Sequence, residues 1–240
     1  MSTVTDPLNL RLDNPSGGRV EAIETRHDRA MVFAGGAMTV SPADLGDAFV
    51  VACDSGYDHA LAAGIAVDLL VGDMDSISDE GRQHAESSGV ATDRHSVAKD
   101  ATDFELGIDA CVRRGIFEIA VFGGESGRID HLLGIATALT SAHWRDVRLR
   151  WHTETGLIIP LVGPGSVALD MPVGSVVSLI AVSDCSAVST NGLAWTLNHD
   201  RLARGTSRGL SNETTALSAA VSITDGAMLV ITSPKGTAHT

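Results

Sequence analysis

The sequence predicts an α/β fold: an N-terminal Rossmann-like, mostly parallel sheet with helices on both faces, followed by a C-terminal antiparallel β-sandwich or barrel. Three observations predict it. Before about Arg150, short apolar runs alternate with stretches of helical spacing. After it, β-rich runs separated by turn residues remain. Acidic residues are also unevenly distributed along the chain, since 16 of the 30 lie between Asp54 and Asp130 and only five from Thr155 onward. We therefore divide the chain into residues 1–28, 29–152 and 153–240.

Residues 1–28 show no apolar periodicity, and we expect them to form a mobile N-terminal arm. Beyond them, four apolar runs bounded by Gly or Asp are typical of buried strands: Met31–Ala34, Phe49–Cys53, Leu69–Val71 and Ile119–Phe122. Two helices are predicted from apolar residues spaced three or four apart. These residues are Phe104, Ile108, Cys111 and Val112, before the helix-ending Gly115, and Ile129, Leu132, Leu133 and Ala136.

The second half of the chain contains five β-rich runs that predict the strands of the sandwich. They are separated by Gly, Pro, Asn and Asp, residues that favour turns. The runs are Leu157–Val162, Ser166–Leu169, Val176–Val182, Ala216–Ile223 and Met228–Ile231. Because no helical stretch lies between them, we expect antiparallel neighbours rather than the parallel pairs of the first half.

Composition excludes several classes of protein. The formal charge of −13, from 17 basic and 30 acidic residues, leaves no basic surface for non-specific nucleic-acid binding and disfavours anionic membranes. No apolar run reaches the roughly 20 residues of a membrane span, and the N-terminus has no apolar signal-peptide core. The three cysteines are far apart and form no CxxC. These features predict a cytoplasmic protein that binds neither nucleic acid nor membrane.

Acidic residues follow the predicted strands or begin the next helix. They are Asp54, Asp73, Asp75, Asp100, Asp103 and Asp130. In an open α/β sheet, ligands bind in the crevice beyond the carboxyl ends of the strands. We therefore expect these carboxylates to converge on one site.

The segment Asp73-Met74-Asp75 suggests a metal site. If it is extended, both carboxylates point into the crevice and Met74 points into the packing. A divalent cation stabilises two such neighbouring charges, and ligands that are all oxygen favour Mg²⁺. Asp100, from the next acidic loop, is the third predicted ligand. The alternative is that one Asp caps a turn while the other is solvated.

Two basic residues lie in the predicted loops that carry the acidic residues. Lys99 is the only lysine of the α/β half, and Arg128 follows the glycine-rich stretch Gly123–Gly127. A glycine loop before a helix offers backbone N–H groups to an anion, and guanidinium matches phosphate oxygens. Both observations point to a phosphate site. The alternatives are a plain ion pair at Lys99 and a capped N-terminus for the helix that follows it.

Six short motifs occur in order and together resemble the thiamine pyrophosphokinase family. They are Asp54-Ser55-Gly56, Gly72-Asp73-Met74-Asp75-Ser76, Lys99-Asp100-Ala101-Thr102-Asp103, Ser126-Gly127-Arg128-Ile129-Asp130-His131, Gly192-Leu193-Ala194-Trp195 and Ser211-Asn212. The resemblance covers roughly residues 30–231. On its own, a tryptophan such as Trp195 is more commonly a core residue, and a turn is the alternative interpretation of Ser211-Asn212.

The resemblance implies transfer of a pyrophosphoryl group from ATP to the hydroxyl of thiamine, with Mg²⁺, giving thiamine diphosphate and AMP. It implies that residues 29–152 bind ATP and Mg²⁺, that residues 153–240 bind thiamine, and that a homodimer shares its site between one subunit's α/β domain and the other's sandwich. The expected catalytic residues are Asp54, Asp73, Asp75, Asp100 and Asp130, with Asp73, Asp75 and Asp100 on the metal. ATP is expected to contact Ser76, Lys99, Asp103, Arg128 and His131, and thiamine to contact Trp195, Ser211 and Asn212.

The chain departs from the family pattern at Ser55, at Tyr57-Asp58 and at Ser126, where the family has small residues. We expect Tyr57 to add bulk on the nucleotide side. Two other functions stay open: a pyrophosphokinase of the same fold with another acceptor, such as a hydroxymethylpterin, and a non-catalytic binder of thiamine or a nucleotide.

Overall fold

The computed structural model describes residues 27–42, 46–95, 101–125 and 127–235. The expected arm, residues 1–28, lies almost entirely outside the described residues. Lys99, Asp100 and Ser126 also lie outside them. Within the described ranges, no helix is long and apolar enough to cross a membrane.

The α/β half is built on parallel strands in the order β4-β3-β2-β1-β5-β6. Each run predicted for this half forms a strand within one residue or two of the expected bounds. Two further strands were not predicted, because β4 is mostly exposed and β6 alternates buried and exposed residues. The strands are β1 Arg29–Phe33, β2 Phe49–Cys53, β3 Leu69–Gly72, β4 Ala91–Arg94, β5 Glu118–Phe122 and β6 Arg148–Thr153.

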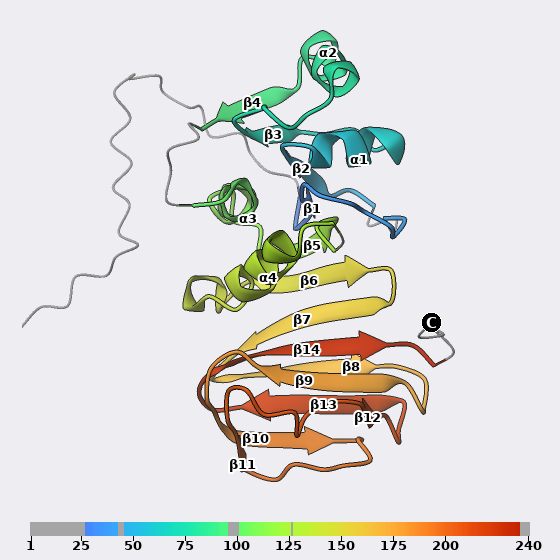
Figure 1. Ribbon diagram of the computed structural model, residues 1–240, viewed down its shortest axis with the longest axis vertical. Coiled ribbons are helices and arrows are strands. Elements are labelled where there is room, and N and C mark those ends of the chain that lie inside the picture. Colours follow the sequence, from blue (N-terminus) through green and yellow to red (C-terminus); the bar gives the residue numbers. More distant parts are fainter. Residues whose placement is uncertain (1–26, 43–45, 96–100, 126, 236–240) are drawn as a thin grey trace, which may run out of the picture.

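Helices cover both faces of this sheet (Figure 1). Helices α3, Asp103–Val112, and α4, Ile129–Ala138, pack on one face, where Ile108 and Trp151 are buried. Helices α1, Gly56–Ala62, and α2, Asp79–Ser88, pack on the other face. Helices α3 and α4 were predicted from the sequence and the other two were not, since α1 and α2 bury mainly small residues and lack a wide apolar stripe.

The C-terminal half forms a sandwich of two antiparallel layers (Figure 1). One layer continues the sheet of the α/β half through the β6–β7 hairpin, giving ten strands in all; its added strands are β7 Gly156–Val162, β14 Ala227–Ser233, β9 Val176–Ala181 and β12 Asn212–Glu213. The other layer has four strands: β11 Asp200–Leu202, β10 Cys185–Asn191, β13 Ser218–Ile223 and β8 Gly165–Asp170. Leu179, Val188 and Val221 are buried between the layers. The expected fold class is confirmed.

Candidate active site

The strand order creates a switch point between β1 and β5. The chain runs from β1 outward through β2, β3 and β4, and then returns to β5 on the other side of β1. Connections therefore leave β1 and β5 in opposite directions, which opens a crevice at their carboxyl ends. A cavity of about 590 Å³ occupies this crevice. Segments that follow β1, β2, β3 and β5 line it, and so do the first residues of α3 and α4.

Three of the expected carboxylates line this cavity, as Asp54, Asp103 and Asp130. Ser76, Arg128 and His131 line it as well. They come from segments that are far apart in the sequence and meet because the parallel strands end at the same edge. The expected convergence of separate acidic loops is therefore confirmed for these side chains.

Asp54 and Asp103 form a hydrogen-bonded carboxyl pair. Burial, first, and then the neighbouring Asp103 raise the pKa of Asp54 from 3.8 to about 7. Asp54 sits at a φ of 46°, and its Oδ1 accepts a hydrogen bond of 3.2 Å from the backbone N–H of Met74. A Cβ on Gly72 would lie 2.0 Å from that Oδ1. A glycine at the end of β3 is therefore what allows the Asp54 side chain to occupy this place.

The expected geometry of Asp73-Met74-Asp75 is wrong. The segment is a turn rather than extended chain, since Met74 has a φ of 67° and the backbone N–H of Asp75 donates to Asp73 Oδ1 at 3.0 Å. Met74 is buried, as expected, but the alternation of side chains that holds for a strand does not apply to this turn. Neither Asp73 nor Asp75 is among the residues that line the cavity.

The start of α4 presents groups suited to an anion. Its N-cap, Arg128, forms no side-chain cap, although the N–H of His131 already donates to the Arg128 carbonyl at 3.1 Å, so the positive end of the helix dipole has no capping side chain. Arg128 is exposed and forms a forked ion pair with Asp130, through Nε at 3.2 Å and Nη2 at 2.6 Å. This pairing lowers the pKa of Asp130 to about 2. Asp130 is thus a weaker base than Asp54.

Helix α3 begins with a capping box, as the alternative of a capped N-terminus allowed. Thr102, not an aspartate, caps the helix in a capping box with Glu105. Asp103 is therefore not needed as the cap and reaches the cavity. Lys99 and Asp100 lie outside the described residues, so their predicted roles stay predictions. Among the described residues, no three His, Cys, Asp or Glu side chains are grouped closely enough to hold a metal ion.

Residues expected to bind thiamine lie on the sandwich. Trp195 is 61 % exposed, whereas Asn212 is buried. The Asn212 amide holds the Trp195 backbone at two points: its Oδ1 accepts from the N–H at 3.0 Å and its Nδ2 donates to the C=O at 2.7 Å. Ser211 has a φ of 56° and its N–H donates to Ser178 Oγ, so it lies in a turn, whereas Asn212 begins strand β12. These contacts present the Trp195 side chain to the exterior.

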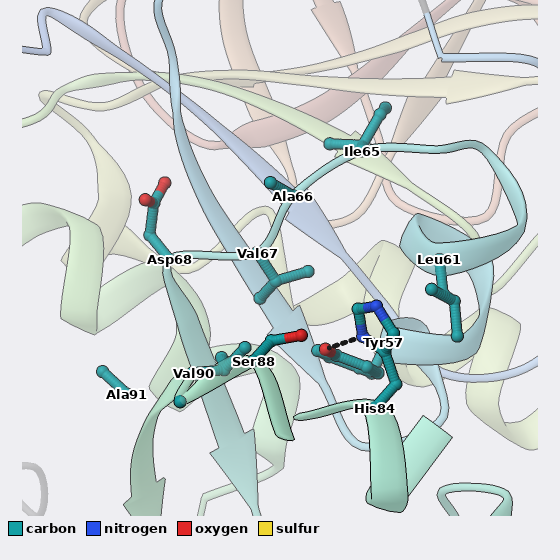
Figure 2. A pocket seen from close by; sticks show the side chains of 11 residues that line it. Tyr57, Leu61, Ile65, Ala66, Val67, Asp68, His84, Ser88, Val90 and Ala91 are labelled. Atoms are coloured by element: carbon teal, nitrogen blue, oxygen red, sulfur yellow. Dashed lines mark hydrogen bonds between the residues drawn. The ribbon is translucent and has the colours of Figure 1, made fainter. Parts of the chain in front are cut away.

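Tyr57 does not lie on the nucleotide side, and that expectation is wrong. Its side chain is 2 % exposed and lines a separate cavity of about 390 Å³ between α1 and α2, where its hydroxyl lies 2.9 Å from His84 Nδ1 (Figure 2). This cavity includes Asp68 and Ala91, at the amino ends of β3 and β4, opposite to the crevice. The neighbouring Asp58 accepts from the N–H and hydroxyl of Ser78, the cap of α2. Both departures from the family pattern thus serve contacts between helices.

Two residues that shape the crevice were not found from the sequence. Trp151 on β6 donates from Nε1 to the carbonyl of Gly123 at 2.9 Å. Glu125, inside the glycine-rich loop, accepts hydrogen bonds from two other segments of the chain. Trp151 belongs to no motif, and in the glycine-rich stretch Gly123–Gly127 only the glycines were assigned a role. For Glu125, the sequence feature that could have identified it is a carboxylate in a loop otherwise rich in glycine.

The protein is therefore of the α/β class. Its open sheet has an acidic crevice at the switch point and continues into a β-sandwich. Two family models match the chain: "Thiamin pyrophosphokinase, catalytic domain" over residues 46–150 and "Thiamin pyrophosphokinase, vitamin B1 binding domain" over residues 167–228. Together they cover more than half of the sequence, in the order of the two halves of the fold. The chain belongs to the thiamin pyrophosphokinase family.

Individual relatives of the chain are thiamin pyrophosphokinases as well. The thiamine pyrophosphokinase of Bacillus subtilis (strain 168) is 26 % identical over 185 residues, covering 76 % of this chain and 86 % of the relative. Its crystal structure superposes with a TM-score of 0.77 at 24 % identity over 86 % of this chain and 99 % of that one. A thiamin pyrophosphokinase family protein from Enterococcus faecalis gives 0.74 at 26 % identity, over 86 % and 99 %. At 17 % identity, the thiamin pyrophosphokinase of Candida albicans shares the fold, with a TM-score of 0.73 over 88 % and 90 %.

Proposed function

We propose that this protein is an ATP-dependent thiamine diphosphokinase, which transfers a pyrophosphoryl group to the hydroxyl of thiamine and releases thiamine diphosphate and AMP. The observation that carries the proposal is the ordered match of both halves of the chain to the catalytic and vitamin B1-binding domains of one family. The crevice supports it, because phosphoryl-type transfer depends on positioning and charge stabilisation, which a glycine loop, an open helix N-terminus and an arginine supply.

On the ATP side, the phosphates would lie against the N-terminus of α4, with Arg128 exchanging part of its pairing with Asp130 for phosphate oxygens. His131 and Ser76 face the same cavity and would contact the nucleotide. Asp54 is the carboxyl group that we assign to the thiamine hydroxyl. Its pKa near neutrality suits a group that accepts a proton, whereas the low pKa of Asp130 does not.

Magnesium is proposed on the chemistry of the donors. The crevice and its rim present carboxylates, the ligands Mg²⁺ prefers, and two of them, Asp54 and Asp103, are direct neighbours in the crevice. Asp73 and Asp75, in the adjoining turn, and Asp100 are the proposed ligands. Asp73 keeps one oxygen free of the turn hydrogen bond. Bound there, Mg²⁺ would neutralise the charge of the phosphates.

On the thiamine side, the exposed indole of Trp195 would stack on the flat cationic rings of the substrate. Asn212 is proposed to act mainly through Trp195, whose backbone it holds, and Ser211 to contact the pyrimidine. The negative charge of the protein favours approach of a cation.

A homodimer with shared sites is proposed because the two half-sites are far apart within one chain. Strand β12, which carries Asn212, is at one edge of the ten-stranded sheet, six strands away from β1. At about 4.8 Å per strand this is about 29 Å, too far for one thiamine molecule. Exposed apolar residues lie at both places and would be covered in the dimer: Ile129 and Leu133 on α4, and Trp195 and Leu217 on the sandwich.

A cytoplasmic location is proposed because the three cysteines, Cys53, Cys111 and Cys185, are all buried and form no disulfide in the described part of the chain.

The experiment that tests the function incubates the purified protein with ATP, Mg²⁺ and thiamine and measures AMP and thiamine diphosphate. We expect AMP to appear only when thiamine is present. AMP formation with a hydroxymethylpterin instead of thiamine would support the other acceptor. Thiamine binding without AMP would identify a non-catalytic binder and contradict the proposal.

A further inference from the structure

Glu125 connects three segments that are distant in the sequence. Its Oε1 accepts hydrogen bonds from the N–H of Thr39 at 2.8 Å, the hydroxyl of Thr39 at 2.5 Å and the N–H of Val40 at 3.3 Å. Its Oε2 accepts from the N–H of Glu154 at 2.6 Å. The loop after β5 is thereby joined to the loop after β1 and to the turn between β6 and β7.

The contacts occupy both carboxylate oxygens. Hydrogen bonds to an ionised acceptor are about twice as strong as neutral ones, and here four donors share one charge. A carboxylate used in this way has little capacity left for a metal ion or a substrate. Its position next to an anion site would also be unfavourable if the charge were not stabilised locally. Both points indicate a structural task for Glu125 in the crevice.

The two loops joined by Oε1 are neighbouring walls of the cavity, since a Cβ on Gly124 would lie 3.5 Å from the carbonyl oxygen of Gly35. Gly35, Gly36 and Ala37 line it from the loop after β1, and Gly124 and Gly127 line it from the loop after β5. Each wall has a separate attachment of its own. The His59 ring nitrogen Nε2 contacts the carbonyl of Gly36, and Trp151 holds the carbonyl of Gly123. Glu125 is the side chain that links one wall to the other.

We propose that Glu125 is a positioning residue that sets the separation of the two glycine walls and so determines affinity for the nucleotide. The proposal rests on the proposed function for its substrate, ATP, and extends it by naming a residue that touches neither reactant. Loss of the link would let the loop after β1 move away from the loop after β5. Because the thiamine half-site lies on the sandwich, affinity for thiamine should depend on Glu125 much less.

The test compares Glu125→Ala and Glu125→Gln with the wild-type protein. We expect Glu125→Ala to raise KM for ATP about tenfold while KM for thiamine and kcat stay within about twofold. Glu125→Gln should be intermediate, because its amide oxygen still accepts from Thr39 while its NH₂ faces the N–H of Glu154. The controls are Glu118→Ala, which removes a carboxylate at the other end of β5, and Glu154→Ala, which keeps the N–H donor. Both should match the wild type.

A readout that needs no turnover accompanies the kinetics. Hydrogen exchange of peptides containing Thr39, Val40 and Glu154 should accelerate in Glu125→Ala, and Kd for ATP should rise with KM. Unchanged exchange, or a lower Tm with ATP affinity within twofold of wild type, would overturn the proposal. Equal increases of both KM values would also overturn it. A wild-type protein without thiamine-dependent AMP formation would contradict the proposed function instead, and the exchange and Kd measurements would still decide the role of Glu125.

Discussion

The carboxyl groups of Asp54, after β2, and Asp103, at the start of α3, hydrogen-bond to each other across the crevice. Two carboxyl groups can do so only while one of them keeps its proton. The half-buried position of Asp54 makes it the proton holder. Among the carboxyl groups in the described part of the crevice, Asp54 has the most strongly shifted pKa. A pH dependence of stability follows from this shift.

Stability should fall as pH rises from about 4 to about 7. The folded protein keeps a proton on Asp54 in this window, whereas the unfolded chain, with a pKa of 3.8, has released it. The folded state therefore binds more protons, and its free energy of unfolding decreases with pH. Asp54→Asn, which tolerates the positive φ and donates to Asp103, should remove this dependence and raise Tm at pH 8 by about 2–4 °C. Thermal unfolding at pH 5 and pH 8 measures it, and a wild-type Tm that rises over this range after correction for other groups would contradict the assignment.

Asp73→Ala should reduce turnover by at least ~10²–10³, because it removes a proposed Mg²⁺ ligand. It also removes the acceptor of the turn hydrogen bond from Asp75. Asp73→Asn is the matched variant, since its amide oxygen keeps the turn while the charge is lost. Steady-state rates over a range of Mg²⁺ concentrations distinguish the two effects. If Asp73→Asn has wild-type activity, the residue matters for the turn and not for a metal.

Asn212→Ala should raise KM for thiamine about tenfold while leaving KM for ATP within twofold. The substitution removes both hydrogen bonds that hold the Trp195 backbone, so the indole loses its fixed position. Leaving partly buried backbone groups unpaired should also lower the free energy of unfolding by about 1 kcal/mol. Kinetics with each substrate in turn, together with urea unfolding, measure both effects. Trp195→Ala should reproduce the KM change without the loss of stability, and a change confined to KM for ATP would contradict the assignment.

Leu133→Asp should convert the proposed homodimer into monomers and abolish activity. Leu133 is 56 % exposed on α4 and lies beside Ile129, which is 74 % exposed, so burial of an introduced charge would oppose association while the monomer still folds. Light scattering gives the mass in solution. Phe117→Asp is the control, since Phe117 is 46 % exposed at the opposite end of β5. A monomeric wild-type protein with full activity would contradict the shared site.

Local patterns were enough to predict most of the fold. Buried strands such as Phe49–Cys53 are short apolar runs that end at an acidic residue or glycine, and α3 has a regular apolar stripe. The predictions failed where burial is small or alternating. Strand β4 exposes most of its residues, and α2 buries only Gly81 and Ala85, so neither has a strong local signature.

Three of the six expected acidic residues, Asp54, Asp103 and Asp130, line the crevice, because a residue that directly follows a parallel strand or begins the next helix lies at the edge where ligands bind. How these side chains are used was not predictable. The turn at Asp73 depends on a positive φ at Met74, and the Asp54–Asp103 pair and the contacts of Glu125 join segments far apart in the chain. Such contacts depend on which strands are neighbours in the sheet, and this spatial order is a non-local property of the fold. Apolar periodicity and motif spacing describe neighbours along the chain, so they locate the crevice and leave its internal pairing to the folded molecule.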